Sequence, residues 1–235
     1  MSNVETRSRL KSIDNVFLFV PNIIGYTRII LASLSLYYMP WHPKVCATLY
    51  CISCLLDAVD GNAARYFDQC SKFGAVLDMV TDRCTTSCLL CFLSLQYTEW
   101  TILFQFLVSL DFSSHYMHMY SSMTAGSTSH KKLSESDYKF LHLYYNSSTV
   151  LFIMCAGNEL FFVTLYFLKF LKEPVSKKVS LIWDLIVAWY ILLVVSGVIC
   201  FAKQFINVVQ IVNASKVLAN VDKEERQKAL SAKEQ

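Results

Sequence analysis

Four aspartates, spaced in two pairs, are the clearest sign of chemistry in this sequence. Asp57 and Asp60 are three residues apart, and Asp78 and Asp82 are four apart. Each pair therefore lies on one face of its segment if that segment is helical. The short connection between the pairs makes the two helices antiparallel neighbours, which can bring the two faces together. The sequence thus predicts four carboxylates in one small volume.

Carboxylates gathered in a poorly hydrated site cannot all stay ionised unless protons or cations compensate them. Aspartate oxygens, with no histidine or cysteine in the pattern, suit Mg²⁺ or Mn²⁺ better than Zn²⁺. Two such ions would neutralise the four charges and form the clamp that is used for displacement at phosphorus. We therefore expect two Mg²⁺ or Mn²⁺ ions at Asp57, Asp60, Asp78 and Asp82.

Small and basic residues near the first pair favour a phosphate-containing ligand. Gly61 and Ala64 lie on the Asp57 face and open it to close approach, and the planar fork of Arg65 can meet phosphate oxygens. Charge placement alone leaves two alternatives, a solvated helix end and the proton or cation pathway of a transporter. A transporter predicts ion flux, whereas an enzyme predicts release of a product.

The composition places these segments in a membrane. Hydrophobic residues make up 54% of the 235 residues and charged residues 17%, and the mean hydropathy is +0.39. Soluble domains usually carry about 25% charged residues. Spanning a hydrocarbon core takes about 20 apolar residues. We expect an all-α integral membrane protein, a bundle of six transmembrane helices at 21–39, 44–66, 74–96, 100–121, 147–168 and 180–203.

Charges outside the spans indicate orientation and partners. The net charge is only +3 and the basic residues are dispersed, which argues against a nucleic-acid partner. Basic residues near the span ends favour cytosolic N- and C-termini, and so place the aspartates at the cytosolic membrane face. We expect a membrane domain over 1–203 and a charged tail over 204–235, in which apolar residues at helical spacing continue the last helix.

Two further patterns concern packing inside the bundle. The nine cysteines lie mostly in apolar runs, which favours reduced thiols buried between helices over a disulfide scaffold or a metal site. An unpaired glutamate in mid-span is costly. Asn158 and Glu159, in the fifth segment, should therefore pair with polar groups of a neighbouring helix.

The aspartates belong to a longer pattern, D-x2-D-G-x2-A-R-x8-G-x3-D-x3-D, which residues 57–82 match at every fixed position. This pattern resembles the signature of the CDP-alcohol phosphatidyltransferase family. The resemblance implies a six-helix membrane enzyme that transfers a phosphatidyl or related group from a CDP-linked donor to an alcohol and releases CMP. It also implies that all four aspartates bind metal and that Asp82 is the catalytic base. The CDP moiety would contact Gly61, Ala64, Arg65 and Gly74.

Segments beyond the motif, including 17–29 and 151–161, are similar to the eukaryotic phosphatidylinositol synthases of that family. This similarity implies CDP-diacylglycerol as donor and myo-inositol as acceptor, within membrane lipid. It also implies residence in the endoplasmic reticulum and the homodimer that is common in the family. Because the motif serves other acceptors, glycerophosphate, serine, choline and ethanolamine remain alternatives.

Five more residues are candidates for binding. Asn22 and Arg28 lie near the cytosolic end of the first span and could border the CDP-diacylglycerol pocket, or serve helix packing and snorkelling. His115 and His118 could donate hydrogen bonds to the acceptor's hydroxyls, or satisfy buried neighbours. Lys131, in the polar loop 122–146, could contact substrate, or simply reflect the excess of basic residues on the cytosolic side.

Overall fold

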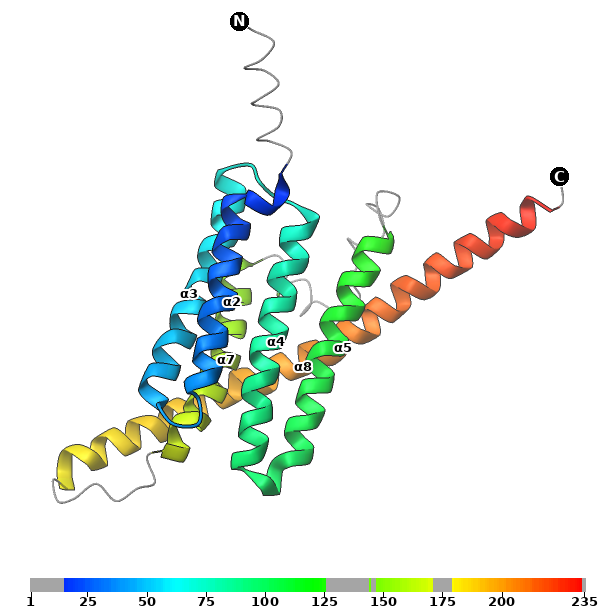
Figure 1. Ribbon diagram of the computed structural model, residues 1–235. Coiled ribbons are helices and arrows are strands. Elements are labelled where there is room, and N and C mark those ends of the chain that lie inside the picture. The colour runs from blue at the N-terminus through cyan, green and yellow to red at the C-terminus, as the bar shows by residue number, and fades with distance from the viewer. Residues whose placement is uncertain (1–14, 126–143, 145–146, 171–178, 234–235) are drawn as a thin grey trace, which may run out of the picture. The chain divides into compact units, whose positions relative to one another are not determined.

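The computed structural model describes residues 15–125, 144, 147–170 and 179–233. Within these ranges all regular structure is helical and there is no strand, so the predicted all-α class is confirmed (Figure 1). The elements are η1 (Val16–Leu18), α2 (Val20–Tyr38), α3 (Pro43–Tyr66), α4 (Lys72–Gln96), η2 (Thr98–Trp100), α5 (Thr101–Ala125), α7 (Ser148–Phe170) and α8 (Val179–Ser231).

The helix starts follow from local sequence. Pro21 and Pro43 stand in the first turns of α2 and α3, where proline's missing N–H leaves no helical hydrogen bond unmade. Ser71 precedes α4, and its Oγ accepts a 2.9 Å hydrogen bond from the N–H of Gly74. This is an N-cap, which satisfies one of the donors that a helix start leaves free.

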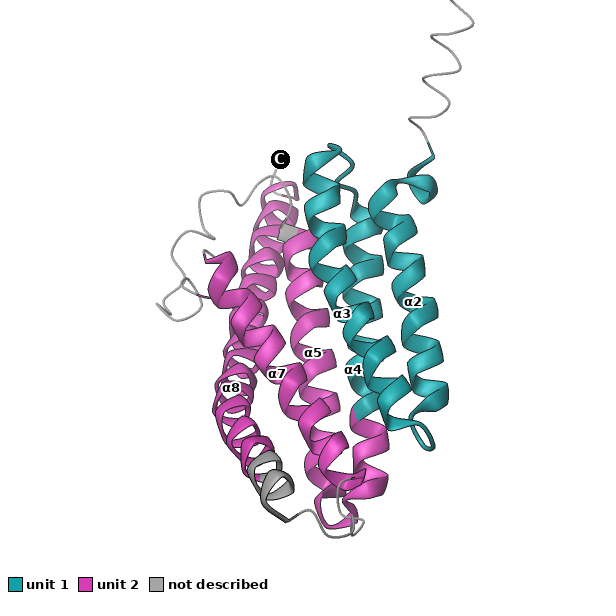
Figure 2. Cartoon of the chain, turned by 90° about the vertical axis from the view of Figure 1, so that its left-hand side faces the viewer, with its two compact units in different colours: residues 1–89 teal, residues 90–235 magenta. Residues whose placement is uncertain are grey.

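The chain divides into two compact units, residues 1–89 and 90–235 (Figure 2). In the first unit α2 and α3 pack along each other, and α3 and α4 run antiparallel, joined by residues 67–71 (Figure 1). The Oγ of Ser35, on α2, donates a 2.9 Å hydrogen bond to the carbonyl of Cys46 on α3. A Cβ at Gly25 would lie 3.1 Å from the side chain of Leu77, so α4 approaches α2 closely there. The predicted antiparallel pair of aspartate-bearing helices is confirmed.

In the second unit α8 packs against α5 and α7. The Oδ1 of Asn158, on α7, accepts hydrogen bonds from Gln204 Nε2 at 2.9 Å and from the thiol of Cys200 at 3.3 Å, both on α8. Glu159 accepts a 3.3 Å hydrogen bond from Asn158. The predicted pairing with a neighbouring helix is thus confirmed for Asn158.

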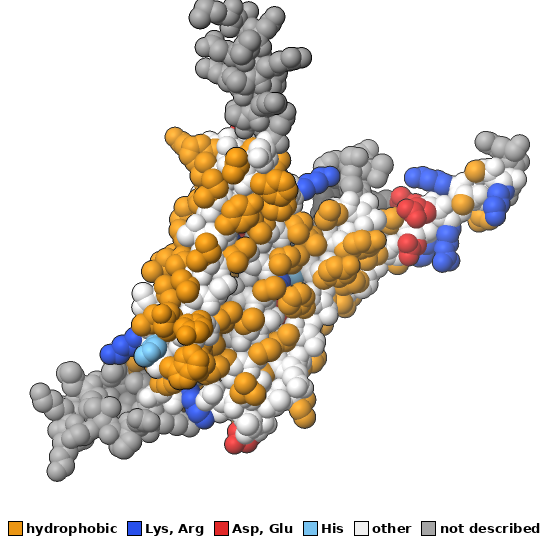
Figure 3. Space-filling model, in the orientation of Figure 1, with side chains coloured by type: hydrophobic (Ala, Val, Ile, Leu, Met, Phe, Trp, Pro, Cys, Tyr) orange, Lys and Arg blue, Asp and Glu red, His pale blue; other side chains and the backbone are white. Residues whose placement is uncertain are grey.

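The exterior of the helices fits a membrane. Among the residues that the structure describes, three helical segments are long and apolar enough to cross one, namely Pro43–Tyr66, Ser148–Phe170 and Val187–Ser231. Large apolar side chains such as Leu55, Ile102 and Phe201 are exposed. Figure 3 shows hydrophobic side chains spread over the visible face, with charged side chains gathered toward the C-terminal end of α8. The helix α2 is not among these three, and it carries polar residues such as Asn22 and Arg28.

Helix α8 continues without a break to Ser231, so the prediction that the tail continues the last helix is confirmed. The division into a membrane domain over 1–203 and a tail over 204–235 stays a prediction. All nine cysteines are free, but only Cys46 and Cys200 are buried. The prediction of buried thiols is wrong for the six exposed ones, because five of them lie on exposed positions of α3 and α4 and Cys70 lies in the connection between these helices: Cys51, Cys54, Cys70, Cys84, Cys88 and Cys91.

Candidate active site

The last turns of α3 and the first turns of α4 bring the aspartates of the motif together. Asp57, Asp60 and Asp78 offer carboxylate oxygens that all lie within 4.8 Å of one another. Such a set of hard oxygen donors fits a divalent cation. Asp82, one turn further along α4, lies outside this group of three but shares a partner with it. We call the four residues the aspartate cluster.

That shared partner is Arg28, on α2. Its Nη1 donates to Asp60 at 2.7 Å and to Asp78 at 2.6 Å, and its Nη2 lies 2.5 Å from oxygens of both Asp57 and Asp82. Bonds between a guanidinium and a carboxylate are among the strongest hydrogen bonds in proteins. The sequence placed Arg28 at the border of a nucleotide pocket, whereas its side chain is directed to the carboxylates.

The cluster has a buried floor and an open rim. The side chains of Arg28 and Asp60 are 3% and 10% exposed, whereas those of Asp57 and Asp78 are 40% and 48% exposed. A ligand therefore reaches the cluster over Asp57 and Asp78. Arg83 supplies a second positive charge, with its Nη2 3.5 Å from Asp82.

A cavity of about 170 Å³ adjoins the cluster at Asp60 and Asp78. Five residues that the sequence assigned to the CDP-linked donor line it: Asn22, Gly61, Ala64, Arg65 and Gly74. Drug-sized ligands occupy about 300–1,000 Å³, so this volume holds only part of a CDP-linked lipid. We call it the donor pocket.

Sequence reasoning missed the part of the donor pocket that the α3–α4 connection forms. Gln69, Cys70 and Ser71 line it, and the Oε1 of Gln69 accepts a 2.8 Å hydrogen bond from the N–H of Val20. No spacing rule marks these residues. The position of the connection directly between the two aspartate helices was the available signal.

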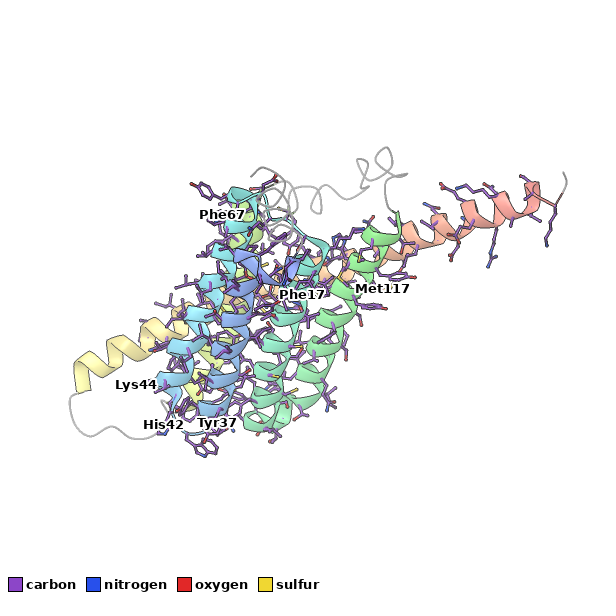
Figure 4. The ribbon with its side chains drawn as sticks, turned by 45° about the horizontal axis from the view of Figure 1, so that its top comes forward. Phe17, Tyr37, His42, Lys44, Phe67 and Met117 are labelled. Carbon is purple, nitrogen blue, oxygen red and sulfur yellow. The ribbon has the colours of Figure 1, made fainter. Side chains whose placement is uncertain are left out.

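The connection lies at one end of the first unit, and the donor pocket is next to it. Phe17 and Phe67 lie toward this end, and Tyr37, His42 and Lys44 lie at the opposite end of α2 and α3 (Figure 4). The ring of Phe17 packs edge-to-face on Phe73 with centroids 4.9 Å apart, which ties η1 to the start of α4.

Comparison with known proteins agrees with this geometry. A family model described as CDP-alcohol phosphatidyltransferase matches residues 18–189, which include the aspartate cluster and the donor pocket. The chain belongs to the CDP-alcohol phosphatidyltransferase family. A CDP-alcohol phosphatidyltransferase has a lipid-biosynthetic role, and with its apolar helices this chain is a membrane protein.

Relatives within the CDP-alcohol phosphatidyltransferase family are similar over nearly the whole chain. A protein of Schizosaccharomyces pombe named CDP-diacylglycerol–inositol 3-phosphatidyltransferase is 51% identical, over 92% of this chain and 94% of its own length. Proteins of the same name from Saccharomyces cerevisiae and Homo sapiens are 45% and 44% identical, over 94% and 92% of this chain and 95% and 98% of their own lengths. No solved structure matches the chain.

The predicted acceptor residues belong to a different part of the chain from the aspartate cluster. His115 and His118 are on α5 in the second unit, and the Nδ1–H of His115 donates a 2.8 Å hydrogen bond to the carbonyl of Asp111, one turn earlier. Their contact with an acceptor stays a prediction. Lys131 lies outside the described residues.

Gly74 offers a test of the donor pocket. A Cβ at this position would lie 2.8 Å from Oδ1 of the buried Asn22 and 3.0 Å from Oγ of Ser71. We expect Gly74→Ala to displace Asn22 and raise the KM for the CDP-linked donor. Alanine favours helix by about 1 kcal/mol relative to glycine. Because this gain offsets the cost of displacing Asn22, the melting temperature should change little.

Gly61→Ala is the matched comparison for Gly74→Ala. A Cβ at Gly61 would meet only the end of the Arg65 side chain, at 3.8 Å, which is ordinary contact. We expect a smaller rise in KM than at Gly74. Equal KM values for the wild type and Gly74→Ala would show that the close approach of Gly74 and Asn22 does not shape the donor pocket.

Proposed function

We propose that this chain transfers the phosphatidyl group of CDP-diacylglycerol to myo-inositol, yielding phosphatidylinositol and CMP. The observation that carries the proposal is the convergence of three carboxylates within 4.8 Å, next to a pocket lined by the residues of the family motif. The acceptor follows from the name shared by relatives that are 44–51% identical over nearly their full lengths.

In this proposal the aspartate cluster holds two ions of Mg²⁺ or Mn²⁺. Its donors are oxygens only, which suits these hard cations. When bound, the cations polarise the phosphoryl oxygens and stabilise the CMP leaving group. The exposed carboxylates of Asp57 and Asp78 give access to the site, and the buried carboxylate of Asp60 anchors it.

Asp82 is the base of the proposed reaction. An inositol hydroxyl oxygen bonds to the phosphorus that carries diacylglycerol, its proton passes to the Asp82 carboxylate, and the bond from that phosphorus to CMP breaks. Asp82 suits this role because its oxygens lie outside the group formed by the other three carboxylates. Alignment of the two substrates and stabilisation of charge are the main sources of rate in transfers of this kind.

The donor pocket holds the CDP moiety. The small residues Gly61, Ala64 and Gly74 allow close approach, and the exposed guanidinium of Arg65 binds a phosphate oxygen. The Oδ1 of Asn62 positions that guanidinium by accepting a 2.7 Å hydrogen bond from its Nη2. The acyl chains of the donor remain in lipid.

The topology proposed with this function has six spans, cytosolic termini and an active site at the cytosolic face of the endoplasmic reticulum. Its support is the close agreement of the helices α2, α3, α4, α5 and α7 with the first five predicted spans, and the start of α8 at Val179, one residue before the predicted sixth span. The lipid donor then reaches the site by diffusion within the bilayer, and the polar acceptor reaches it from the aqueous phase. A homodimer is part of the same proposal.

The test is release of CMP by the purified full-length chain in detergent micelles that contain CDP-diacylglycerol. We expect release only when both myo-inositol and Mg²⁺ or Mn²⁺ are present, and loss of release when EDTA is added. Glycerol 3-phosphate, serine, choline and ethanolamine serve as acceptor controls. Release with one of these alcohols and not with inositol would show that inositol is not the acceptor. Ion flux in liposomes without CMP release would show that the chain is a transporter and not this enzyme.

A further inference from the structure

Arg28 connects the two aspartate-bearing helices through both of its terminal nitrogens. Nη1 bridges Asp60 of α3 and Asp78 of α4, and Nη2 bridges Asp57 of α3 and Asp82 of α4. A planar guanidinium can form this double bridge because its donors point outward in a rigid fork. One side chain of α2 thus contacts two carboxylates of α3 and two of α4.

The position of Arg28 is held from its backbone as well. The hydroxyl of Ser53, a buried residue of α3, donates a 3.2 Å hydrogen bond to the carbonyl of Arg28. Arg28 itself is only 2% exposed. A guanidinium stays protonated in proteins, so a permanent positive charge lies at the floor of the aspartate cluster.

We propose that Arg28 is the internal counterion of the metal site, and that it sets the site's affinity for divalent cations by competing for the same carboxylates. The three aspartates that could hold a cation each bond to Arg28 at 2.5–2.7 Å. A cation must therefore take oxygens that this side chain already binds, beside a charge of its own sign. The inference rests on the metal role proposed above.

Two opposite consequences follow for a protein that lacks the Arg28 charge. Without divalent cations the four carboxylates repel one another, and the fold loses stability. With divalent cations the same carboxylates bind more tightly, since neither competition nor like-charge repulsion remains. If Arg28 had only a structural role, its loss would weaken cation binding, because a disturbed cluster would hold cations less well.

The experiment compares Arg28→Gln with the wild type, using the full-length chain in detergent. Mn²⁺ binding is measured from the electron paramagnetic resonance signal of free Mn²⁺, and melting temperature is measured in EDTA and in Mn²⁺. We expect the Mn²⁺ dissociation constant to fall by about tenfold or more, the melting temperature in EDTA to drop, and the rise on adding Mn²⁺ to exceed that of the wild type.

Two further variants complete the design. Arg28→Lys keeps the charge but replaces the fork by a single ammonium, so its Mn²⁺ affinity should stay near that of the wild type while its melting temperature in EDTA falls. Lys72→Gln removes an exposed positive charge at the start of α4 and should change neither quantity.

The outcomes separate this inference from the proposed function. Mn²⁺ binding in Arg28→Gln that is equal to or weaker than in the wild type overturns the role of Arg28, and CMP release by the wild type would still stand. If Arg28→Gln does not fold in EDTA, the dissociation constant is measured after folding in Mn²⁺, and Arg28→Lys gives the second comparison. A wild type that binds no Mn²⁺ overturns both the inference and the metal role.

Discussion

Replacement of Asp82 by asparagine should lower inositol-dependent CMP release by about 10³-fold or more, because it removes both the proposed base and a carboxylate of the metal site. The substitution is nearly isosteric. In the wild type Arg28 lies 2.5 Å from the Asp82 carboxylate, and the amide oxygen of the variant can still accept a hydrogen bond from it. The fold should therefore persist. The measurement is the initial rate of CMP release by purified protein whose melting temperature stays close to that of the wild type.

Asp78→Asn is the comparison that separates the base from the ligands. Asp78 belongs to the group of three carboxylates and its side chain is 48% exposed. Loss of this carboxylate should weaken cation binding, so raising the Mn²⁺ concentration should restore part of the activity. The same titration should not rescue Asp82→Asn, because a missing base cannot be replaced by cations. Near-normal turnover in Asp82→Asn would remove its assigned role.

The second large effect is expected at Asp60, the most buried of the four carboxylates. Asp60→Asn leaves the Arg28 charge with less compensation in a poorly hydrated site, since the 2.7 Å bond to Asp60 becomes a bond to a neutral amide. Removing one partner of a buried ion pair costs about 3–5 kcal/mol. With three carboxylates still present, we expect a loss of about 1–3 kcal/mol in the free energy of unfolding.

Asp68→Asn is the matched control for Asp60→Asn. Asp68 is exposed, in the connection between α3 and α4, and its φ of 54° is a conformation that asparagine tolerates well. The same change of charge should therefore leave stability and activity unaltered. Equal melting temperatures for Asp60→Asn and the wild type would contradict the idea that Asp60 compensates the buried charge of Arg28.

The class of fold and the four members of the aspartate cluster can be predicted from the order of the residues alone. Spacings of three and four residues place each pair of aspartates on one helix face, and a short connection makes the helices neighbours; both consequences depend only on helix geometry. Apolar segments likewise predict the helices, because their lengths match the thickness of a membrane's hydrocarbon core. The ends of α2, α3 and α7 lie within two residues of the predicted ends.

The roles of Arg28 in the aspartate cluster and of the α3–α4 connection in the donor pocket become visible only once the helices are packed. A lone arginine in an apolar span can snorkel, pack or pair, and its position along the chain does not distinguish these outcomes. Its partners lie 29–54 residues away on two other helices, so the packing of α2 against α3 and α4 selects them. The same packing places Gln69, Cys70 and Ser71 beside the donor pocket. Local periodicity predicts which face a residue occupies, whereas the atoms opposite that face depend on contacts between segments distant in the chain.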